Sequence, residues 1–367
     1  MSSRTPETPI HRFAHSLVDR LLALGEMFYR IGLWGVQASY RSGLRKVHRL
    51  PVKVVSVGNL TWGGTGKTPL VIQLAKGLKA KGYSPAVLTR GYGWDEAKLL
   101  ADRLSPIPVV VGPDRVASGR RAARDLGADL LLLDDGYQQW RLKKDLEILT
   151  VDAGAPFGNG HLIPRGSLRE PIPCAARADL IVVTRADLNP GEVKDLKERI
   201  RKVSPKAPIF LARYQPTRIT KWPSGQELPW SRLQGEPICT LAGIADPKQF
   251  ETTVERLGAE IGLKIRVQDH HPYSIHEMVR IFARCQQHRI RRIVTTAKDA
   301  VRIPGGVGER LGDGLRSGVA GLGAGVAGPE AGVAGLREVE LLVLDVSLAF
   351  EPDESELLHR IDSVLAG

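Results

Sequence analysis

A glycine-rich stretch at residues 58–69, with the sequence GNLTWGGTGKTP, carries the clearest chemical signal in this chain of 367 residues. It follows a short β-branched run at residues 53–59 and precedes leucines at helical spacing, so it joins a predicted strand to a predicted helix. Glycines allow several backbone N–H groups to point toward one centre, where they form an anion-binding nest with the helix N-terminus. The pattern predicts a phosphate-binding P-loop, although the usual first glycine of GxxxxGK[ST] is Thr61 here.

Two side chains of this loop have expected roles beyond the backbone nest. Lys67 is expected to reach the β- and γ-phosphates of a nucleotide, and the Thr68 hydroxyl is expected to bind Mg²⁺. The nucleotide-binding residues predicted for the loop are Gly63, Gly64, Thr65, Gly66, Lys67 and Thr68.

A pair of acidic residues follows the apolar run at residues 130–133. Four leucines predict a buried strand, and Asp134 and Asp135 emerge at its carboxyl end, where open α/β sheets bind their ligands. A P-loop needs such a carboxylate on the magnesium side. Asp134 is the first choice for the metal and Asp135 the second, whereas two solvated acids in a turn are the alternative.

Strand and helix patterns alternate through the middle of the chain and must position these groups. Strands are predicted at residues 53–59, 86–89, 107–111, 130–133, 146–151, 180–183 and 209–212, with helices at 67–81, 114–126 and 191–202. This alternation predicts an α/β fold of the P-loop NTPase type, with a mostly parallel sheet and helices on both faces. The predicted domain covers residues 51–221.

A second, smaller α/β domain is predicted at residues 237–367, after a turn-rich linker at 222–236. Within it, residues 305–336 contain 12 glycines and three copies of GVAG. Because glycine disfavours helix formation, we interpret this tract as a flexible surface insertion without a chemical role.

The N-terminal segment, residues 1–50, has the pattern of an amphipathic helix followed by a basic cluster. One helical face carries Leu17, Leu21, Leu24, Phe28 and Ile31, and the segment has eight Lys or Arg against three Asp or Glu. Such a helix either lies on an anionic membrane surface or packs on its own domain.

Composition excludes several classes of protein. A hydrophobic content of 43% is too high for a disordered chain, and three widely spaced cysteines favour neither a disulfide framework nor a zinc site. Neither an 18-residue apolar stretch nor a signal-peptide core occurs. The net charge of +12 indicates an anionic partner without choosing among nucleic acid, lipid and phosphorylated substrates.

Six motifs in order make the chain recognisable: VGNLTWGGTGKTP, TRGYG, LDDGYQ, GNGHLIPRGSLREP, QDHHPY and TTAKDAVR. Together they resemble the tetraacyldisaccharide 4′-kinase family of lipid A biosynthesis, from about residue 20 to the C-terminus without the glycine-rich tract. The resemblance implies a peripheral enzyme on the cytoplasmic face of the bacterial inner membrane. With ATP and Mg²⁺, it would phosphorylate the 4′-hydroxyl of a tetraacylated glucosamine disaccharide 1-phosphate. It also favours membrane contact by the N-terminal helix.

The resemblance also assigns site residues. Arg169 and Glu170 match the Arg-Glu pair of the family's LREP motif, where Arg can face phosphate and Glu can join the metal ligands with Thr68, Asp134 and Asp135. His270 matches the histidine that pairs with a catalytic aspartate.

The position of that aspartate is open. The family places it in a Gly-Asp-Glu-Pro motif well after GYG, whereas Trp94-Asp95-Glu96-Ala97 follows GYG directly here. Asp95 is the candidate general base and Asp114 the alternative. With Asp95 in the first domain and His270 in the second, their contact is expected to require closure of the two domains.

Two other functions compete with a lipid kinase. A P-loop switch or metallochaperone-type NTPase would act on a protein partner and would hydrolyse nucleotide without an acceptor. A nucleic-acid ATPase would use stacking aromatic residues, which make up only 5% of the chain. We therefore expect a lipid substrate and a membrane surface as partners, with neither nucleic acid nor an obligate protein partner.

Overall fold

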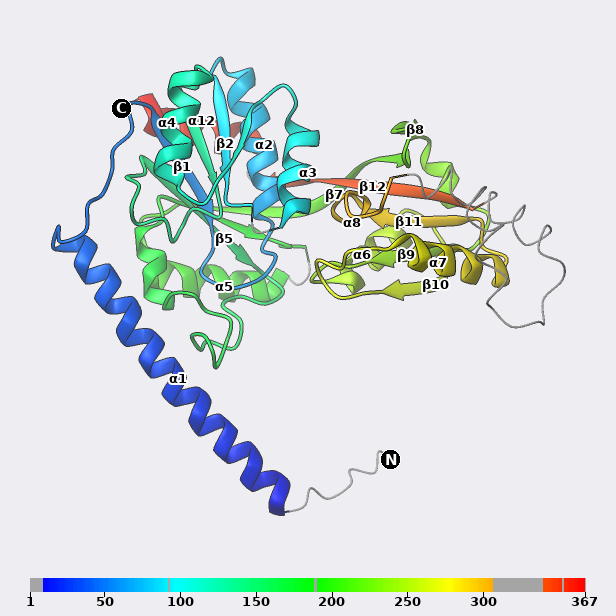
Figure 1. Cartoon of the computed structure of the whole chain (residues 1–367), viewed down its shortest axis with the longest axis horizontal. Coiled ribbons are helices and arrows are strands. Elements are labelled where there is room, and N and C mark those ends of the chain that lie inside the picture. The colour runs from blue at the N-terminus through cyan, green and yellow to red at the C-terminus, as the bar shows by residue number, and fades with distance from the viewer. Residues whose placement is uncertain (1–8, 92, 188–189, 306–338, 352, 367) are drawn as a thin grey trace. The chain divides into compact units, whose positions relative to one another are not determined.

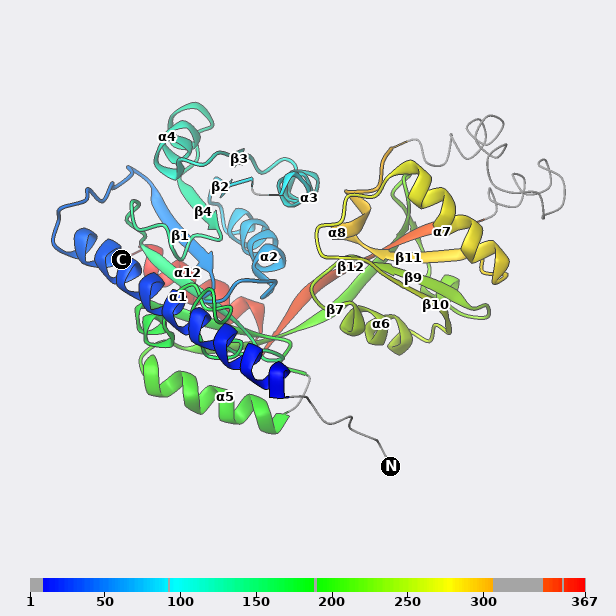
Figure 2. The same cartoon turned by 60° about the horizontal axis from the view of Figure 1, so that its bottom comes forward.

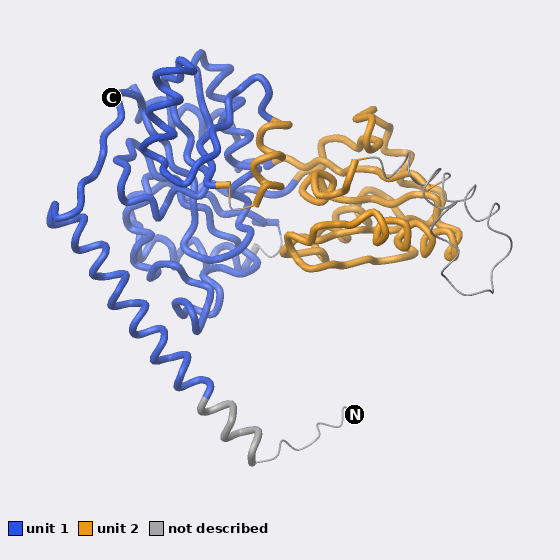
Figure 3. Tube along the Cα trace, in the orientation of Figure 1, with its two compact units in different colours: residues 1–90, 104–214, 348–367 blue, residues 91–103, 215–347 orange. Residues whose placement is uncertain are grey.

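The computed structural model describes residues 9–91, 93–187, 190–305, 339–351 and 353–366, with side chains from residue 18 onward apart from Pro190. The predicted glycine-rich insertion lies outside these residues, except for Gly305, as does the side chain of Leu17. The chain forms two compact units (Figure 3). Unit 1 comprises residues 1–90, 104–214 and 348–367, and unit 2 comprises 91–103 and 215–347.

Unit 1 is built on a parallel sheet (Figure 1). In sheet order its strands are β7 (Ile209–Lys221, which continues into unit 2), β6 (Leu180–Thr184), β5 (Leu146–Asp152), β1 (Lys53–Gly58), β4 (Leu130–Asp134), β2 (Pro85–Thr89) and β3 (Val109–Val111). Every residue of β4 is buried, which requires cover on both faces.

Helices supply that cover. Leu131 and Leu133 share a core cluster with Val116 and Ala122 of α4 (Arg115–Asp125), so α4 covers the face to which they point. Since successive strand residues alternate between faces, Leu130 and Leu132 point to the other face. There α2 (Lys67–Ala80) contacts β1, β2 and β4. The remaining helices of unit 1 are α1 (Pro9–Arg41), η1 (Ile172–Arg177), α5 (Pro190–Val203) and α12 (Glu354–Ala366).

Unit 2 has its own parallel strands. Their order is β10 (Ile261–Arg266), β9 (Ile238–Ala242), β11 (Arg292–Thr296) and β12 (Glu340–Glu351, whose end belongs to unit 1). Figure 2 shows α6 (Pro247–Arg256) and α7 (Ile275–Gln287) on opposite sides of these strands. The described part of unit 2 also contains α3 (Trp94–Leu104, whose last residue belongs to unit 1), β8 (Gln226–Leu228), η2 (Trp230–Leu233) and α8 (Ala297–Ala300). The predicted fold class is confirmed.

The units differ in extent from the predicted domains. Helix α12 belongs to unit 1, because the Leu358 side chain packs against Gly77 of α2 and the Tyr83 hydroxyl donates to Asp362 at 2.6 Å. The predicted linker at 222–236 is a folded part of unit 2. There β8 pairs antiparallel with β7, and Leu233 is completely buried.

The N-terminal helix α1 packs against the rest of unit 1 through polar residues. The buried Glu26 accepts a hydrogen bond from the Leu162 backbone N–H at 3.1 Å, and the Tyr29 hydroxyl donates to the Arg169 carbonyl at 2.9 Å. Many of the apolar residues on this helix are exposed instead. Those between 51% and 68% exposed include Leu21, Leu24, Phe28, Ile31 and Trp34. None of the helices in the described ranges combines the length and apolar character needed to cross a bilayer.

Candidate active site

The predicted phosphate loop joins β1 to α2 and is fixed by the strands beside it. Gly66 precedes α2 with a φ of 79°, and a Cβ there would lie 3.0 Å from the Tyr214 hydroxyl and from Thr184 Cγ2. The Thr65 and Thr150 hydroxyls share a hydrogen bond of 2.7 Å, and the Thr184 hydroxyl donates to the Thr65 carbonyl at 3.2 Å. The backbone at Gly66 is therefore held with a positive φ, which only glycine adopts without strain.

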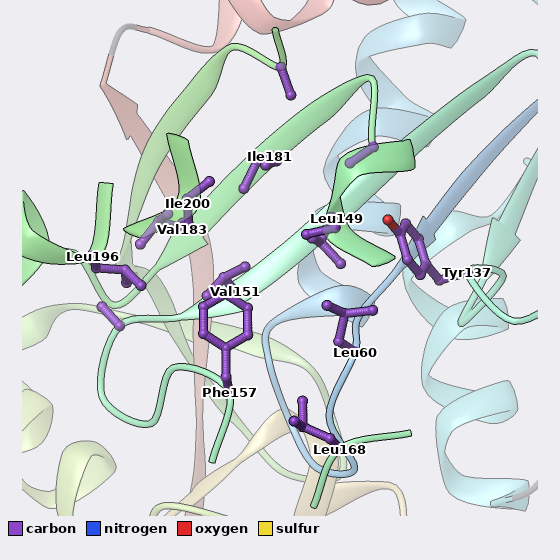
Figure 4. Packing of buried hydrophobic residues seen from close by; sticks show 14 of the residues in the cluster. Leu60, Tyr137, Leu149, Val151, Phe157, Leu168, Ile181, Val183, Leu196 and Ile200 are labelled. Carbon is purple, nitrogen blue, oxygen red and sulfur yellow. The ribbon is translucent and has the colours of Figure 1, made fainter. Parts of the chain in front are cut away.

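The first half of the loop is anchored in the core. Leu60 is buried in a cluster that includes Leu149, Phe157 and Leu168 (Figure 4). The Leu60 carbonyl accepts from the Arg169 backbone N–H at 2.7 Å. The sequence around Arg169 is thereby held against the loop, although it lies about a hundred residues later in the chain.

Lys67 is positioned by contacts across the loop. Its Nζ donates to Asn59 Oδ1 at 3.2 Å and to the Gly63 carbonyl at 3.3 Å, and it lies 3.7 Å from Asp135 Oδ1. An ammonium group held in this way at a glycine-rich loop is well placed to bind phosphate oxygens.

Arg169 and Asp135 form a paired group beside Lys67. The two terminal nitrogens of Arg169 donate to the two oxygens of Asp135 at 2.8 and 2.9 Å, and one of them also donates to Asn59 Oδ1. Burial alone would raise the pKa of Asp135. The hydrogen bonds from Arg169 and the charges of Lys67, Arg169 and Arg115 outweigh it, so the pKa is lowered.

Glu170 is fully buried and belongs to a second network. Arg177 donates to both of its oxygens at 2.6 and 2.8 Å, and Gln138 and Gln37 donate at 2.9 and 3.2 Å. The Arg177 guanidinium itself stacks on Tyr137, 3.8 Å from the ring centroid. Both oxygens of Glu170 are thus occupied by protein donors. This arrangement suits a residue that fixes the backbone of Arg169 better than a metal ligand.

The remaining oxygen donors fit Mg²⁺. The half-buried Thr68 lies in the first turn of α2. Asp134 ends β4 in register with Val57 of β1, so it lies at the strand that enters the loop. Mg²⁺ in kinases is typically bound by one or two protein oxygens together with substrate phosphates. Within the described residues no group of three or more His, Cys, Asp or Glu is placed to hold a metal ion.

Asp95 and His270 contact each other within unit 2. Asp95 lies in the first turn of α3 and is 3% exposed, and its Oδ2 lies 3.1 Å from His270 Nδ1. Arg302 also donates from Nε to the same oxygen at 2.6 Å. Burial would raise the pKa of Asp95, but the hydrogen bond and charge of Arg302, with His270, lower it overall.

This contact corrects the expectation of domain closure. Asp95 and His270 belong to one unit, because α3 is tied to it by several ion pairs. Arg103 donates to Asp345 at 2.6 Å, and Lys298 lies 3.4 Å from Glu96. The pair therefore lies within one compact unit, although its residues come from the two predicted domains.

Asp114, the alternative base, occupies a different kind of position. Its carboxylate caps α4 by accepting from the backbone N–H groups of Val116 and Ala117 at 2.9 and 3.2 Å. A capping carboxylate already has a structural role. The contact with His270 therefore favours Asp95 as the candidate base.

Gly93 offers a test of how closely Asp95 must be held. A Cβ at this position would overlap Asp95 Oδ1 and come within 3.5 Å of His270 Nδ1. We expect Gly93→Ala to displace the carboxylate and lower kcat by about tenfold or more, since small misplacements of a catalytic group are costly. Steady-state kinetics should show this loss with an unchanged KM for ATP. The control is Gly305→Ala, at an open position in the same unit. An unchanged kcat in Gly93→Ala would contradict the prediction.

Some site residues were not predicted from the sequence. Asn59, Arg177 and Arg302 all bind predicted site residues through side chains. Arg302 ends the motif TTAKDAVR, which sequence analysis noted without assigning a chemical role. Arg302 lies 207 residues from Asp95, and Asn59 lies 110 residues from Arg169, so local patterns do not reveal these contacts.

Comparisons with known proteins agree on one family. The model of the family described as tetraacyldisaccharide-1-P 4′-kinase, LpxK, matches residues 18–95 and 94–311. A tetraacyldisaccharide 4′-kinase of Syntrophus aciditrophicus is 38% identical over 327 residues, which are 81% of this chain and 87% of that protein. One from Anaeromyxobacter dehalogenans is 36% identical, over 82% of this chain and 85% of that protein.

A solved structure shares the fold. The crystal structure of LpxK from Aquifex aeolicus in complex with ATP has a TM-score of 0.68 and 24% sequence identity. The match covers 95% of this chain and 99% of that one. The family model and the two relatives confirm the resemblance noted from the motifs.

Proposed function

Because the chain belongs to the tetraacyldisaccharide 4′-kinase family, we propose that it transfers the γ-phosphoryl group of ATP to the 4′-hydroxyl of a tetraacylated glucosamine disaccharide 1-phosphate. The chain is therefore an enzyme of lipid A biosynthesis. The observation that carries the chemistry is the phosphate loop, where Lys67 and Arg169 converge on Asn59 and Asp135. Family membership does not favour the competing NTPase-switch hypothesis.

The loop residues would act on the transferred phosphoryl group. Phosphoryl transfer has a loose transition state with charge spread over the equatorial oxygens, so positioning and electrostatics supply most of the rate enhancement. The backbone N–H groups of residues 63–66 would hold the phosphates, and Lys67 would lie against the γ-phosphate. Arg169 would add a second cation. Thr68 and Asp134 would hold Mg²⁺, which supplies further charge neutralisation when bound.

Asp95 would accept the proton of the acceptor hydroxyl. A sugar hydroxyl is a poor nucleophile at neutral pH, and general-base assistance is typically worth about 10²–10⁴-fold. The lowered pKa keeps Asp95 ionised and able to accept a proton at neutral pH. His270 would orient the carboxylate through the hydrogen bond at its Nδ1.

A direct assay tests the proposal. Purified protein should convert the disaccharide 1-phosphate to its 4′-phosphorylated product with radiolabelled ATP and Mg²⁺, dispersed in detergent micelles. The disaccharide lacking the 4′-hydroxyl should give no product. ATP hydrolysis without transfer to the lipid would reject the kinase function.

We propose further that the protein is peripheral on the cytoplasmic face of the inner membrane. The support is the exposed apolar face of α1, followed by the exposed basic residues Arg41, Arg45, Lys46 and Arg49. An apolar face beside a basic cluster is typical of helices that bind anionic bilayers.

Three substitutions on α1 test the membrane contact. The combined variant Phe28→Ser, Ile31→Ser and Trp34→Ser should lower binding to phosphatidylglycerol vesicles by roughly tenfold or more, because it removes the apolar area that would enter the bilayer. Vesicle pelleting gives the measurement. Detergent-dispersed substrate should still be phosphorylated at a similar kcat.

The control is the variant Leu126→Ser with Val364→Ser, which changes exposed apolar residues elsewhere in unit 1. It should bind vesicles like the wild type. Equal vesicle binding by the α1 variant would refute the proposed membrane face.

A further inference from the structure

A network of charged residues contacts the Asp95–His270 pair in unit 2, and two of its members, Asp299 and Arg302, are buried. It gathers at the carboxyl ends of the parallel strands β9, β10 and β11, from Gly243, the Asp269–His270 turn and the segment Thr296–Arg302. The motif TTAKDAVR contributes most of it, through Lys298, Asp299 and Arg302.

Two contacts hold the Arg302 side chain in place in addition to its contact with Asp95. Its side chain is 1% exposed, and one terminal nitrogen donates to the Gly243 carbonyl at 2.8 Å and lies 3.4 Å from Asp299 Oδ1. Its Nε then donates to Asp95 Oδ2 at 2.6 Å. The guanidinium plane therefore determines where this carboxylate oxygen lies.

Asp299 is itself held rigidly. It is fully buried and accepts from the Tyr273 hydroxyl and the Gly243 backbone N–H, both at 3.0 Å, and from the Thr296 hydroxyl at 2.7 Å. With so many donors it remains a stable anchor for Arg302.

The contact with Lys298 favours one tautomer of His270. Its Nζ lies 3.3 Å from His270 Nε2 and 3.2 Å from Asp269 Oδ1. A lysine ammonium can only donate, so Nε2 must accept, and the ring proton is then on Nδ1. That proton points to Asp95 Oδ2 at 3.1 Å.

We propose that Arg302 and Lys298 are positioning residues for phosphoryl transfer, which hold Asp95 so that Oδ1 is the oxygen that accepts the hydroxyl proton. Both side-chain hydrogen bonds given above for this carboxylate, from Arg302 and from His270, end on Oδ2. Arg302 acts on the carboxylate directly, and Lys298 acts through the tautomer of His270. This inference rests on the proposed function.

The charges around Asp95 predict a pH signature. Arg302 and His270 face the carboxylate directly, and the surrounding charged groups are Glu96, Asp269, Lys298 and Asp299. Loss of the guanidinium removes the main group that lowers the pKa of Asp95, so that pKa should rise. Because the base must be ionised, the acidic limb of kcat should move to higher pH.

The experiment compares Arg302→Met with Arg302→Lys in the full chain. We expect Arg302→Met to lower kcat by about 10²-fold or more and to shift the acidic limb upward. Arg302→Lys, which keeps the charge, should keep the limb near its wild-type position with a smaller loss of kcat. KM for ATP should change little in either variant.

The control is Arg266→Met, which breaks the ion pair of Arg266 with the buried Glu251 in the same unit. It should leave kcat and the pH profile unchanged. A merely structural role of Arg302 would lower stability and reduce kcat equally at every pH. A folded Arg302→Met protein with the wild-type kcat and profile would overturn the proposal.

A second measurement does not depend on activity or on a buried substitution. Nitrogen-15 NMR of labelled histidine should find His270 with its proton on Nδ1 in the wild type. The partly exposed Lys298→Met should shift the population toward the Nε2–H form. A wild-type protein without lipid kinase activity would reject the proposed function alone, whereas the Nε2–H tautomer in the wild type would reject this inference alone.

Discussion

Replacing Lys67 by alanine is expected to lower the kcat of lipid phosphorylation by about a thousandfold, the scale of removing a cation from a phosphoryl-transfer transition state. The reason lies in the loop geometry. Lys67 Nζ lies within 3.3 Å of the Gly63 carbonyl and of Asn59 Oδ1. It is therefore already positioned beside the backbone nest in which the γ-phosphate would bind. No other lysine is among the predicted nucleotide-binding residues.

Radiolabelled transfer and ATP titration together measure this effect. Lys67→Ala should bind ATP more weakly and remain folded, with a melting temperature close to that of the wild type. Lys76→Ala, an exposed lysine on the same helix, is the matched control and should be fully active. If Lys67→Ala retained a tenth or more of the wild-type turnover, the assignment of the loop as the phosphate site would fail.

Asp95→Asn is the second large effect, with an expected loss of about 10²–10⁴-fold in kcat. Asparagine keeps the volume of the side chain but cannot accept a proton from the substrate hydroxyl. ATP binding should remain near the wild-type level, because the predicted nucleotide-binding residues belong to unit 1 and Asp95 to unit 2.

The pH dependence sharpens this test. Burial acts to raise the pKa of Asp95, but Arg302 and His270 lower it overall, so the wild-type acidic limb should lie below the usual range of an aspartate. Activity should therefore fall only at strongly acidic pH if no other group intervenes. The Asn variant should lack this limb.

Stability must be followed in parallel, because Asp95→Asn removes the counter-charge of the buried Arg302. A lower melting temperature is expected, and kcat should be measured well below it. Asp102→Asn, at an exposed position on the same helix α3, should behave as the wild type. If Asp95→Asn kept near-normal turnover and Asp114→Asn were inactive, Asp114 would be the general base instead of Asp95.

The local elements of the site could be predicted from the sequence because their causes are local. A β-branched run, a glycine loop and a leucine-spaced helix are contiguous, so β1, the phosphate loop and α2 follow from residues 53–81. The four leucines before Asp134 likewise predict a buried parallel strand. The amphipathic character of α1 could also be predicted from the sequence, because helical spacing alone places Leu21, Leu24 and Phe28 on one face.

Only the tertiary structure decided what these elements contact. Helical spacing gives α1 two faces, but it does not say that the polar Glu26 and Tyr29 bind unit 1 while the apolar face remains exposed. The same holds for Glu170, a metal-ligand candidate by sequence whose oxygens bind Arg177, Gln138 and Gln37.

The assignment of α3 to unit 2 is another feature that could not be predicted from the sequence. Chain order places Asp95 just after the phosphate loop and β2, yet its partners Arg302 and His270 lie about two hundred residues later. Sequence by itself determined the fold class, the phosphate loop and the family, because each depends on neighbouring residues or on motifs in order. The partner of a buried charge depends instead on which distant segment packs against it. The resemblance already paired His270 with the candidate base Asp95, but only the three-dimensional fold decided that Arg302 also binds Asp95.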